Sequence, residues 1–271
     1  MFSFVVIILS TLALCLLVAF CWIGRLSWWL LILPVVGLVS FYLFQALYFG
    51  LLGLTGLFVT KKKEYRERSP FYAWVQTRMI EILCIFFKLR IHVSGKEIVP
   101  REGSFYLVGN HQSIFDPMLT YMFLHDRRFA FISKPENFAM PLLGRIIHRN
   151  LFLPIDRDNN RHALLTMAKA TEMLTKRNYS IGIYPEGHRN NTDELLLPFH
   201  VGSFRVPIKA NVPVLIAVTD GAKNVEKKQL WRTTHVQFRF VELVEAGSFN
   251  DNQSLCDYCR KRIADDLLAH S

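Results

Sequence analysis

Charged side chains are almost missing from the first 60 residues of this 271-residue chain: Arg25 is the only one before Lys61. Two long apolar runs, residues 2–23 and 28–59, fill this part. Each is long enough for a helix to cross the hydrocarbon core of a bilayer, which takes about 20 residues. Hydrophobic residues make up 51% of the chain and the mean hydropathy is +0.22, which argues against a purely soluble protein. The sequence therefore predicts an integral membrane protein with a membrane anchor at residues 1–60.

The first apolar run also lacks the basic start that a cleaved signal peptide would have. No Lys or Arg precedes it, and a second apolar run follows directly. We therefore expect two transmembrane helices that form a hairpin. One span with a surface-lying segment is the alternative, because Pro34 and four glycines interrupt the second run.

A basic segment follows the anchor at once. Residues 61–68 read KKKEYRER. Lys and Arg beside a span favour the cytoplasmic side of a membrane, and they attract anionic lipid headgroups. The predicted division is a membrane anchor at residues 1–60, a basic juxtamembrane segment with an amphipathic helix at 61–90, and a domain at 91–271 on the cytoplasmic side.

The excess of basic residues excludes few functions by itself. The net charge is +10, and nearly all of it lies after residue 60. No nucleic-acid-binding motif and no interleaving of basic and aromatic residues is present, so we expect membrane lipids or an anionic substrate as partners and no nucleic acid. The five cysteines form no disulfide framework. Cys256 and Cys259 form a lone C-x-x-C without a second pair, and we expect no metal site.

Short apolar runs alternate with helical patterns from residue 90 onward. We expect strands at residues 90–93, 104–108, 128–133, 151–155, 180–184, 212–218 and 236–244. We expect helices at residues 70–89, 113–124, 161–177, 199–210 and 255–269. This alternation predicts an α/β domain with a parallel or mixed sheet flanked by helices. The last strand alternates as an edge strand does. In the helix at 161–177, the residues expected to share an apolar face are Leu164, Leu165, Ala168, Met173 and Leu174.

One segment combines a histidine with a carboxylate at the start of an expected helix. Residues 110–117 read NHQSIFDP and follow the strand expected at 104–108. Histidine accepts a proton near neutral pH, and a carboxylate on its far ring nitrogen fixes the tautomer and stabilises the imidazolium. A turn over five residues lets Asp116 reach back to His111, which predicts a general base. A capping box made by Ser113 and Asp116 is the alternative.

A second polar loop follows the strand expected at 180–184. Residues 183–189 read IYPEGHR, in which Pro and Gly turn the backbone sharply. The turn presents Glu186 and Arg189 on one loop. A guanidinium group fits a phosphate through two parallel hydrogen bonds, so the loop predicts an anion-binding site. A solvated ion pair on a surface turn is the alternative.

Together the two loops resemble the glycerolipid acyltransferase family, whose members acylate lysophosphatidic acid and related acceptors. The family's N-H-x-x-x-x-D block is matched by Asn110, His111 and Asp116. Its P-E-G-T-R block is matched by residues 185–189, where His188 stands in place of Thr.

Two further blocks of the family are also matched, in the family's order. In the second block, a Lys, a Pro and a Gly precede an apolar strand that ends in Asp-Arg, and the matching residues are Lys134, Pro141, Gly144, Asp156 and Arg157. The fourth block is matched loosely by Val-Pro-Val at residues 212–214. The resemblance covers residues 96–219. It implies a glycerolipid-acyltransferase-like α/β domain, which the N-terminal transmembrane helices precede.

The resemblance implies a reaction as well as a fold. His111 would deprotonate the acceptor hydroxyl, and Asp116 would orient His111. The acceptor oxygen would attack the thioester carbonyl of an acyl-CoA or an acyl-carrier protein. The expected acceptor is lysophosphatidic acid, acylated at the sn-2 hydroxyl to phosphatidic acid without a cofactor or a metal. The residues expected to bind substrate are Asn110, Lys134, Arg157, Glu186, Gly187 and Arg189.

Within this resemblance the arginines and Lys134 would hold the acceptor's phosphate, and Glu186 would position its glycerol part. The alternatives are an acyltransferase for another lysolipid and a non-catalytic membrane lipid-binding protein. A hydrolase with a serine nucleophile is disfavoured because the chain contains no G-x-S-x-G motif. Water in place of the acceptor would turn the same His–Asp pair into a thioesterase.

Overall fold

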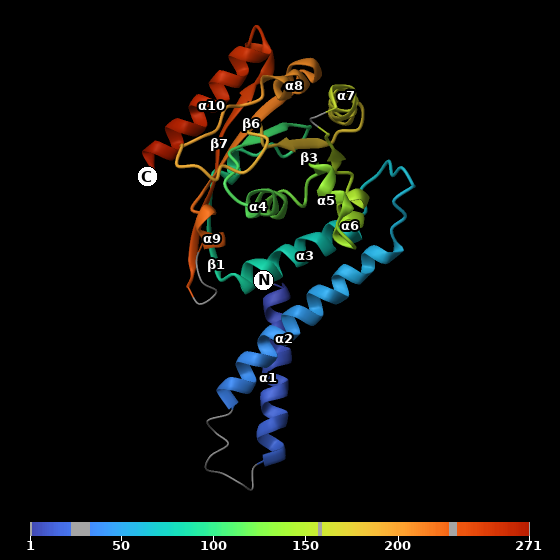
Figure 1. Ribbon diagram of the computed structural model, residues 1–271, viewed down its shortest axis with the longest axis vertical. Coiled ribbons are helices and arrows are strands. Elements are labelled where there is room, and N and C mark those ends of the chain that lie inside the picture. The colour runs from blue at the N-terminus through green and yellow to red at the C-terminus, as the bar shows by residue number, and fades with distance from the viewer. Residues whose placement is uncertain (1, 23–32, 157–158, 228–231, 271) are drawn as a thin grey trace.

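Two parts of the molecule are visible in its outline. In the computed structural model, a sheet with helices on both faces lies above two long helices that extend away from it (Figure 1). These two helices are α1 (Phe2–Trp22) and α2 (Leu33–Leu54), and a short 3₁₀ helix at Thr55–Phe58 continues α2. The structure describes residues 2–22, 33–156, 159–227 and 232–270. Arg25 and Arg157 lie outside the described residues.

The sheet is mixed and has seven strands, in the order β1-β7-β6-β2-β5-β3-β4. The strands are β1 (Leu89–Ser94), β2 (Tyr106–Gly109), β3 (Phe129–Ser133), β4 (Leu153–Pro154), β5 (Ser180–Ile183), β6 (Pro213–Asp220) and β7 (Thr234–Glu245). Only the pair β6–β7 is antiparallel; the other pairs are parallel. The predicted α/β fold with a mixed sheet flanked by helices is confirmed.

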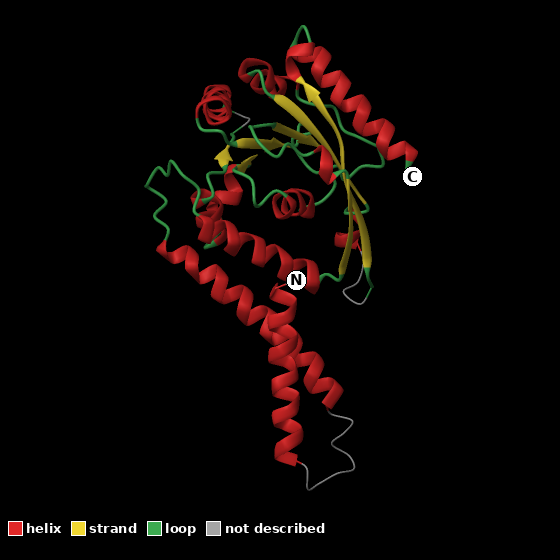
Figure 2. Cartoon of the chain, turned by 180° about the vertical axis from the view of Figure 1, so that it is seen from behind, coloured by secondary structure: helices red, strands yellow, loops and turns green. Residues whose placement is uncertain are grey.

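Helices cover both faces of the sheet. The helices α7 (Asn160–Lys176), α8 (Arg205–Ala210) and α10 (Asn252–Ala269) lie on one side, and α3 (Pro70–Phe86) and α4 (Phe115–Phe123) lie on the other (Figures 1 and 2). Because both faces are covered, the central strands β2 and β5 are buried along their whole length. The central strands therefore need near-continuous apolar runs, which the sequence contains.

The helix α3 belongs to two hydrophobic cores at once. Its residues Ile80 and Cys84 pack into the core of the sheet domain. Other residues of α3 join a second, smaller core with α1, α2 and α6 (Leu143–Arg149), whose buried members are Ile7, Leu52, Val75, Met79, Ile82 and Ile146. The packing of α3 thus fixes the two long helices to the sheet domain. The exposed aromatic residues of α3, Phe71 and Trp74, stack near its first turn.

One described helix is long and apolar enough to cross a membrane, namely Leu33–Phe58, with 26 residues. The qualifying apolar stretch of α1 is shorter, at Val5–Ala19. Within the described residues, then, the second of the two predicted spans meets this criterion and the first does not. The two helices pack against each other as the hairpin prediction requires.

Most predicted elements are present, with ends that differ by a few residues, and three expectations are wrong. The strand β7 is not at an edge: it lies between β1 and β6, and its alternation arises because one of its faces is solvated. The buried face of α7 is made by Thr166, Ala170, Met173 and Leu174, whereas Leu164 and Leu165 are exposed. The helix expected at 199–210 is divided into a 3₁₀ turn at Val201–Phe204 and α8. The short helices α5 (Pro135–Ala139), α6 and α9 (Lys223–Lys227) had not been predicted.

Close packing at Gly182 in β5 leaves no room for a side chain. A Cβ atom there would lie 2.5 Å from a ring carbon of Phe131 and 2.6 Å from one of Phe129. Because both rings are buried, we expect Gly182→Ala to lower the free energy of unfolding by about 1–3 kcal/mol. Gly202→Ala is the matched control, since nothing lies within 4 Å of its Cβ position. Thermal unfolding in detergent measures both, and equal stability of the two variants would contradict the packing argument.

Candidate active site

The carboxyl ends of four parallel strands meet at one edge of the sheet. The strands β2, β3, β5 and β6 run in the same direction, so the loops that follow them lie side by side. The strand β2 leads into residues 110–116, and β5 leads into residues 184–190. Ligands of α/β proteins bind at this kind of edge. The structure therefore brings together the two polar loops that the sequence separates by about 70 residues.

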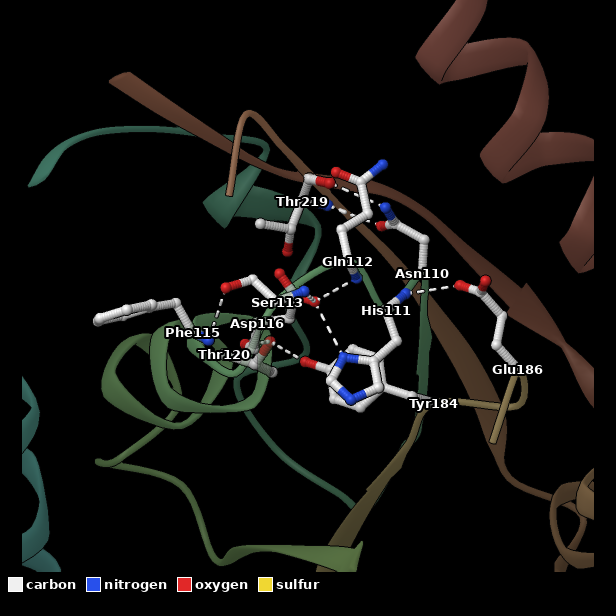
Figure 3. A network of polar contacts seen from close by, with 10 residues as sticks. All are labelled: Asn110, His111, Gln112, Ser113, Phe115, Asp116, Thr120, Tyr184, Glu186 and Thr219. Carbon is white, nitrogen blue, oxygen red and sulfur yellow. Dashed lines mark hydrogen bonds and ion pairs between the residues drawn. The ribbon is translucent and has the colours of Figure 1, made fainter. Parts of the chain in front are cut away.

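The ring of His111 is held by a hydrogen bond to a buried carboxylate. His111 Nδ1 donates to Asp116 Oδ2 at 2.9 Å (Figure 3). The side chain of His111 is 18% exposed, whereas that of Asp116 is fully buried. The second ring nitrogen, Nε2, points away from this network and has no hydrogen-bond partner among the described residues. With the proton on Nδ1, Nε2 carries the lone pair that can accept a proton.

One oxygen of Asp116 collects three donors. Besides His111, the backbone amides of Gln112 and Ser113 donate to Oδ2 at 2.6 and 2.7 Å. Burial raises the pKa of the Asp116 carboxyl, and the three hydrogen bonds offset this only in part. The amide contact with Ser113 is the kind that the capping alternative predicted. The same carboxylate oxygen therefore stabilises the start of α4 and holds the imidazole.

The loop after β5 holds the backbone of His111 on both sides. Glu186 Oε1 accepts from the His111 amide at 2.6 Å, and the Asn190 amide donates to the His111 carbonyl oxygen at 2.7 Å. Glu186 is 1% exposed, and its Oε2 accepts from the Leu197 amide at 3.0 Å. Burial raises the pKa of Glu186, and the two amides lower it in part. The structure thus gives Glu186 the task of positioning His111; its predicted contact with the glycerol part of a substrate stays a prediction.

The turn between β5 and this loop requires a glycine. Gly187 has φ of +85°, a conformation that side chains disfavour. Its amide donates to the Tyr184 carbonyl oxygen at 3.1 Å, which closes the turn. Gly187 therefore determines the path of the chain from Tyr184 to Arg189, and its predicted substrate contact is not tested by this geometry.

The sequence prediction omitted Tyr184 from the site. Its ring stacks on the ring of His111, with centroids 4.8 Å apart and an interplanar angle of 26° (Figure 3). On its other side it stacks on Phe131 at 5.6 Å and 15°. The Tyr184 hydroxyl lies 2.8 Å from Thr120 Oγ1, which donates to the Asp116 carbonyl oxygen at 2.9 Å, so Tyr184 is the donor of this pair. The available signal was an aromatic residue directly before the Pro-Glu-Gly turn.

Asn110 joins two strands at the base of the site. Its Nδ2 donates to the Thr219 carbonyl oxygen at 2.8 Å, and its Oδ1 accepts from the Thr219 amide at 2.9 Å (Figure 3). Its side chain is fully buried. The structure therefore gives Asn110 the task of linking β2 to β6, and its predicted substrate contact stays a prediction.

Comparisons with known proteins agree with this geometry. A family model described as Acyltransferase matches residues 90–218. The 1-acyl-sn-glycerol-3-phosphate acyltransferase of Haemophilus influenzae is 31% identical over 208 residues, which cover 74% of this chain and 85% of that protein. This chain belongs to the glycerolipid acyltransferase family. As a glycerolipid acyltransferase it is an enzyme, so the alternative of a non-catalytic lipid-binding protein is set aside.

This glycerolipid acyltransferase is also similar to a human protein and to a solved structure. The human 1-acyl-sn-glycerol-3-phosphate acyltransferase beta is 28% identical over 187 residues, which cover 68% of this chain and 66% of that protein. The crystal structure of the 1-acyl-sn-glycerophosphate (LPA) acyltransferase from Thermotoga maritima superposes with a TM-score of 0.58 at 22% identity. That match covers 84% of this chain and 96% of the Thermotoga chain, and it shows the shared fold.

The predicted phosphate-binding residues of this glycerolipid acyltransferase are spread along the same sheet edge. Arg189 is half-buried and lies beside Asn190, whose amide bonds to His111. Lys134 is exposed and directly follows β3. Arg157 lies outside the described residues, so the structure places two of the three predicted cations at this edge. His188, which replaces the family's Thr, is exposed. In the described ranges no group of three or more His, Cys, Asp or Glu side chains could hold a metal ion.

The stack between Tyr184 and His111 leads to the first test of this site. Tyr184→Phe keeps the stacked ring, so we expect a kcat close to that of the wild type. Tyr184→Leu removes the stack, and we expect kcat to fall about 2- to 10-fold at unchanged KM, because an aromatic pair is worth roughly 0.5–1.5 kcal/mol. Steady-state kinetics with pH profiles for both variants measure this. Equal kcat values for Phe and Leu would contradict a positioning role of the ring.

Because Glu186 is buried, we expect the free energy of unfolding to depend on pH. Because burial raises its pKa in the folded protein, its contribution to stability is fully present below its ordinary pKa and is lost as the pH rises through the raised value. Glu186→Gln cannot titrate. We therefore expect the wild type to lose stability relative to Glu186→Gln as the pH rises from about 4 through the weakly acidic range. Apparent unfolding temperatures at a series of pH values measure this difference, and a constant difference would contradict it.

Proposed function

We propose that this enzyme transfers an acyl chain from a thioester donor, acyl-CoA or acyl-carrier protein, to the sn-2 hydroxyl of lysophosphatidic acid. The product would be phosphatidic acid. The observation that carries the proposal is the arrangement of His111, whose Nδ1 bonds to a buried carboxylate while Nε2 points away from the network. The acceptor is proposed from the curated relatives, which are named 1-acyl-sn-glycerol-3-phosphate acyltransferases.

The proposed reaction needs no covalent intermediate on the protein. His111 Nε2 takes the proton of the acceptor hydroxyl as the oxygen attacks the thioester carbonyl carbon. A tetrahedral intermediate forms, and the carbon–sulfur bond then breaks. The leaving thiolate takes the proton back from Nε2, so the enzyme returns to its initial state. Asp116 holds Nδ1–H throughout and stabilises the imidazolium that forms.

The acceptor's phosphate is the second part of the proposal. Arg189 and Arg157, with Lys134 as a further cation, would bind the phosphate and thereby set the position of the hydroxyl relative to Nε2. Positioning of this kind supplies a large share of the rate in reactions between two bound substrates. We also propose that the chain is an integral membrane protein with its catalytic domain on the cytoplasmic side. The apolar helix at Leu33–Phe58 and the lysines at 61–63 support this placement.

Acyl transfer by His111 variants tests the proposed base. We expect His111→Ala to lower kcat about 10²- to 10⁴-fold with labelled acyl-CoA or acyl-carrier protein as donor and lysophosphatidic acid as acceptor. His92→Ala on β1 is the control, because His92 is exposed and stacks only on His235. Normal product formation by folded His111→Ala would overturn the role of His111. The donor that supports turnover identifies the thioester.

A second variant separates acceptor binding from proton transfer. Arg189→Gln is expected to raise KM for lysophosphatidic acid, because an arginine–phosphate contact is lost, and to leave KM for the donor unchanged. A raised donor KM with an unchanged acceptor KM would assign Arg189 to the thioester substrate. No phosphatidic acid from wild-type protein, with product from another lysolipid, would correct the proposed acceptor.

A further inference from the structure

A second basic cavity lies away from His111, at the far end of the sheet. It has a volume of about 400 Å³ and is formed by the segment after α2, the end of α6, β4 and α7. Its cationic lining residues are Lys61, Lys62, Lys63, Lys169 and Arg177. In the sheet order, β4 lies three strands from β2, roughly 14 Å at the usual strand spacing. Among the described residues, none of the predicted site residues lines this cavity.

The positive charge of the cavity is largely uncompensated. Among the described residues, Glu64 is the only acidic residue in its lining, and it pairs with Lys169. Lys61 Nζ donates to the neutral carbonyl oxygen of Phe138 at 2.7 Å. For Lys62 the described residues provide no partner. Five Lys and Arg against one Glu therefore leave four positive charges, which an anion would stabilise.

Arg177 is a second feature of the cavity that favours an anion. Its guanidinium lies 5.4 Å from the ring centroid of Tyr179, and its Nη2 is buried without a hydrogen-bond partner in the described part of the chain. The nearby carboxylate of Glu67 bonds instead to Arg128 and Tyr179. A buried guanidinium nitrogen without a partner is unfavourable, and a phosphate oxygen would satisfy this group.

The position and the walls of the cavity favour a lipid. Its lysines follow directly on the apolar helix Leu33–Phe58, which ends with Leu57 and Phe58, 58% and 85% exposed. The apolar part of its lining is formed by Leu151, Phe152, Leu153, Pro154, Leu165 and Met173. Cations beside an apolar wall at the end of a membrane helix match the phosphate and the glycerol ester part of a phospholipid.

We propose that this cavity binds the headgroup phosphate of an anionic phospholipid from the membrane surface, at a site separate from the His111 site. The inference rests on the membrane placement proposed above, but it does not require the proposed reaction. Lys62 and Arg177 hold the phosphate, and Leu165 contacts the glycerol ester region. A bound lipid of this kind docks the catalytic domain against the bilayer that supplies its substrate.

The test uses the full-length protein in micelles of an uncharged detergent, titrated with fluorescent phosphatidylglycerol. We expect saturable binding by the wild type and at least about 10-fold weaker binding by Lys62→Gln/Arg177→Gln, because each cation near a lipid surface contributes about one kcal/mol. Arg260→Gln/Lys261→Gln is the matched control. It removes one Arg and one Lys from exposed positions on α10, which packs on β6 and β7, away from the cavity at β4 (Figure 1). The charge-conserving variant Lys62→Arg/Arg177→Lys is expected to bind the probe about as tightly as the wild type does.

Four results would overturn the proposal. Equal binding by the two charge-removing variants would show that the cavity holds no phosphate. Displacement of the probe by CoA would assign the cavity to the donor's phosphates. Weaker binding by Arg189→Gln would place the probe at the acceptor site. Equally tight binding of fluorescent phosphatidylcholine would show that the anionic charge is not recognised. Failure of the proposed reaction is distinguishable, because it would abolish acyl transfer and leave phosphatidylglycerol binding intact.

Discussion

The proposed chemistry depends on a carboxylate that is fully buried and yet within hydrogen-bond distance of a partly exposed imidazole. Burial of a charge is unfavourable unless hydrogen bonds replace the lost water. Asp116 meets this condition in part: its Oδ2 accepts three hydrogen bonds, two of them from backbone amides of the loop that carries His111, whereas its Oδ1 is buried without a hydrogen-bond partner among the described residues. It also stands in the first turn of α4, where the helix dipole favours a negative charge. The position of the carboxylate is therefore inseparable from the start of the helix.

The contacts that restrain His111 come from two loops, and the sheet brings these loops together. Parallel pairing of β2 with β5 brings the two polar loops together at one edge. There Glu186 and Asn190 bond to the backbone of His111, and the ring of Tyr184 stacks on the ring of His111. His111 is thus restrained through its amide, its carbonyl group and its ring. A base held on three sides loses little freedom when a substrate binds, and this preorganisation favours proton transfer.

The long helices and the sheet domain are connected through α3. One face of α3 belongs to the core of the domain, and another packs on α1 and α2. This shared helix sets the distance between the apolar helix Leu33–Phe58 and the loop that carries His111. It also leaves the basic segment at 61–68 at the surface, between α2 and α7. An enzyme whose acceptor and product are lipids benefits from such a fixed relation between anchor and active site.

The amino-acid sequence determined the fold class, the apolar character of the N-terminal helices and the pairing of His111 with Asp116, because these depend on composition, periodicity and short spacings along the chain. The tertiary structure alone decided which residues surround that pair. The stack of Tyr184 on His111 and the bonds of Asn110 to Thr219 join residues 73 and 109 positions apart. Glu186 likewise contacts a backbone amide 75 positions away. Such contacts follow from strand order, and strand order is set by the packing of the whole sheet rather than by any local pattern.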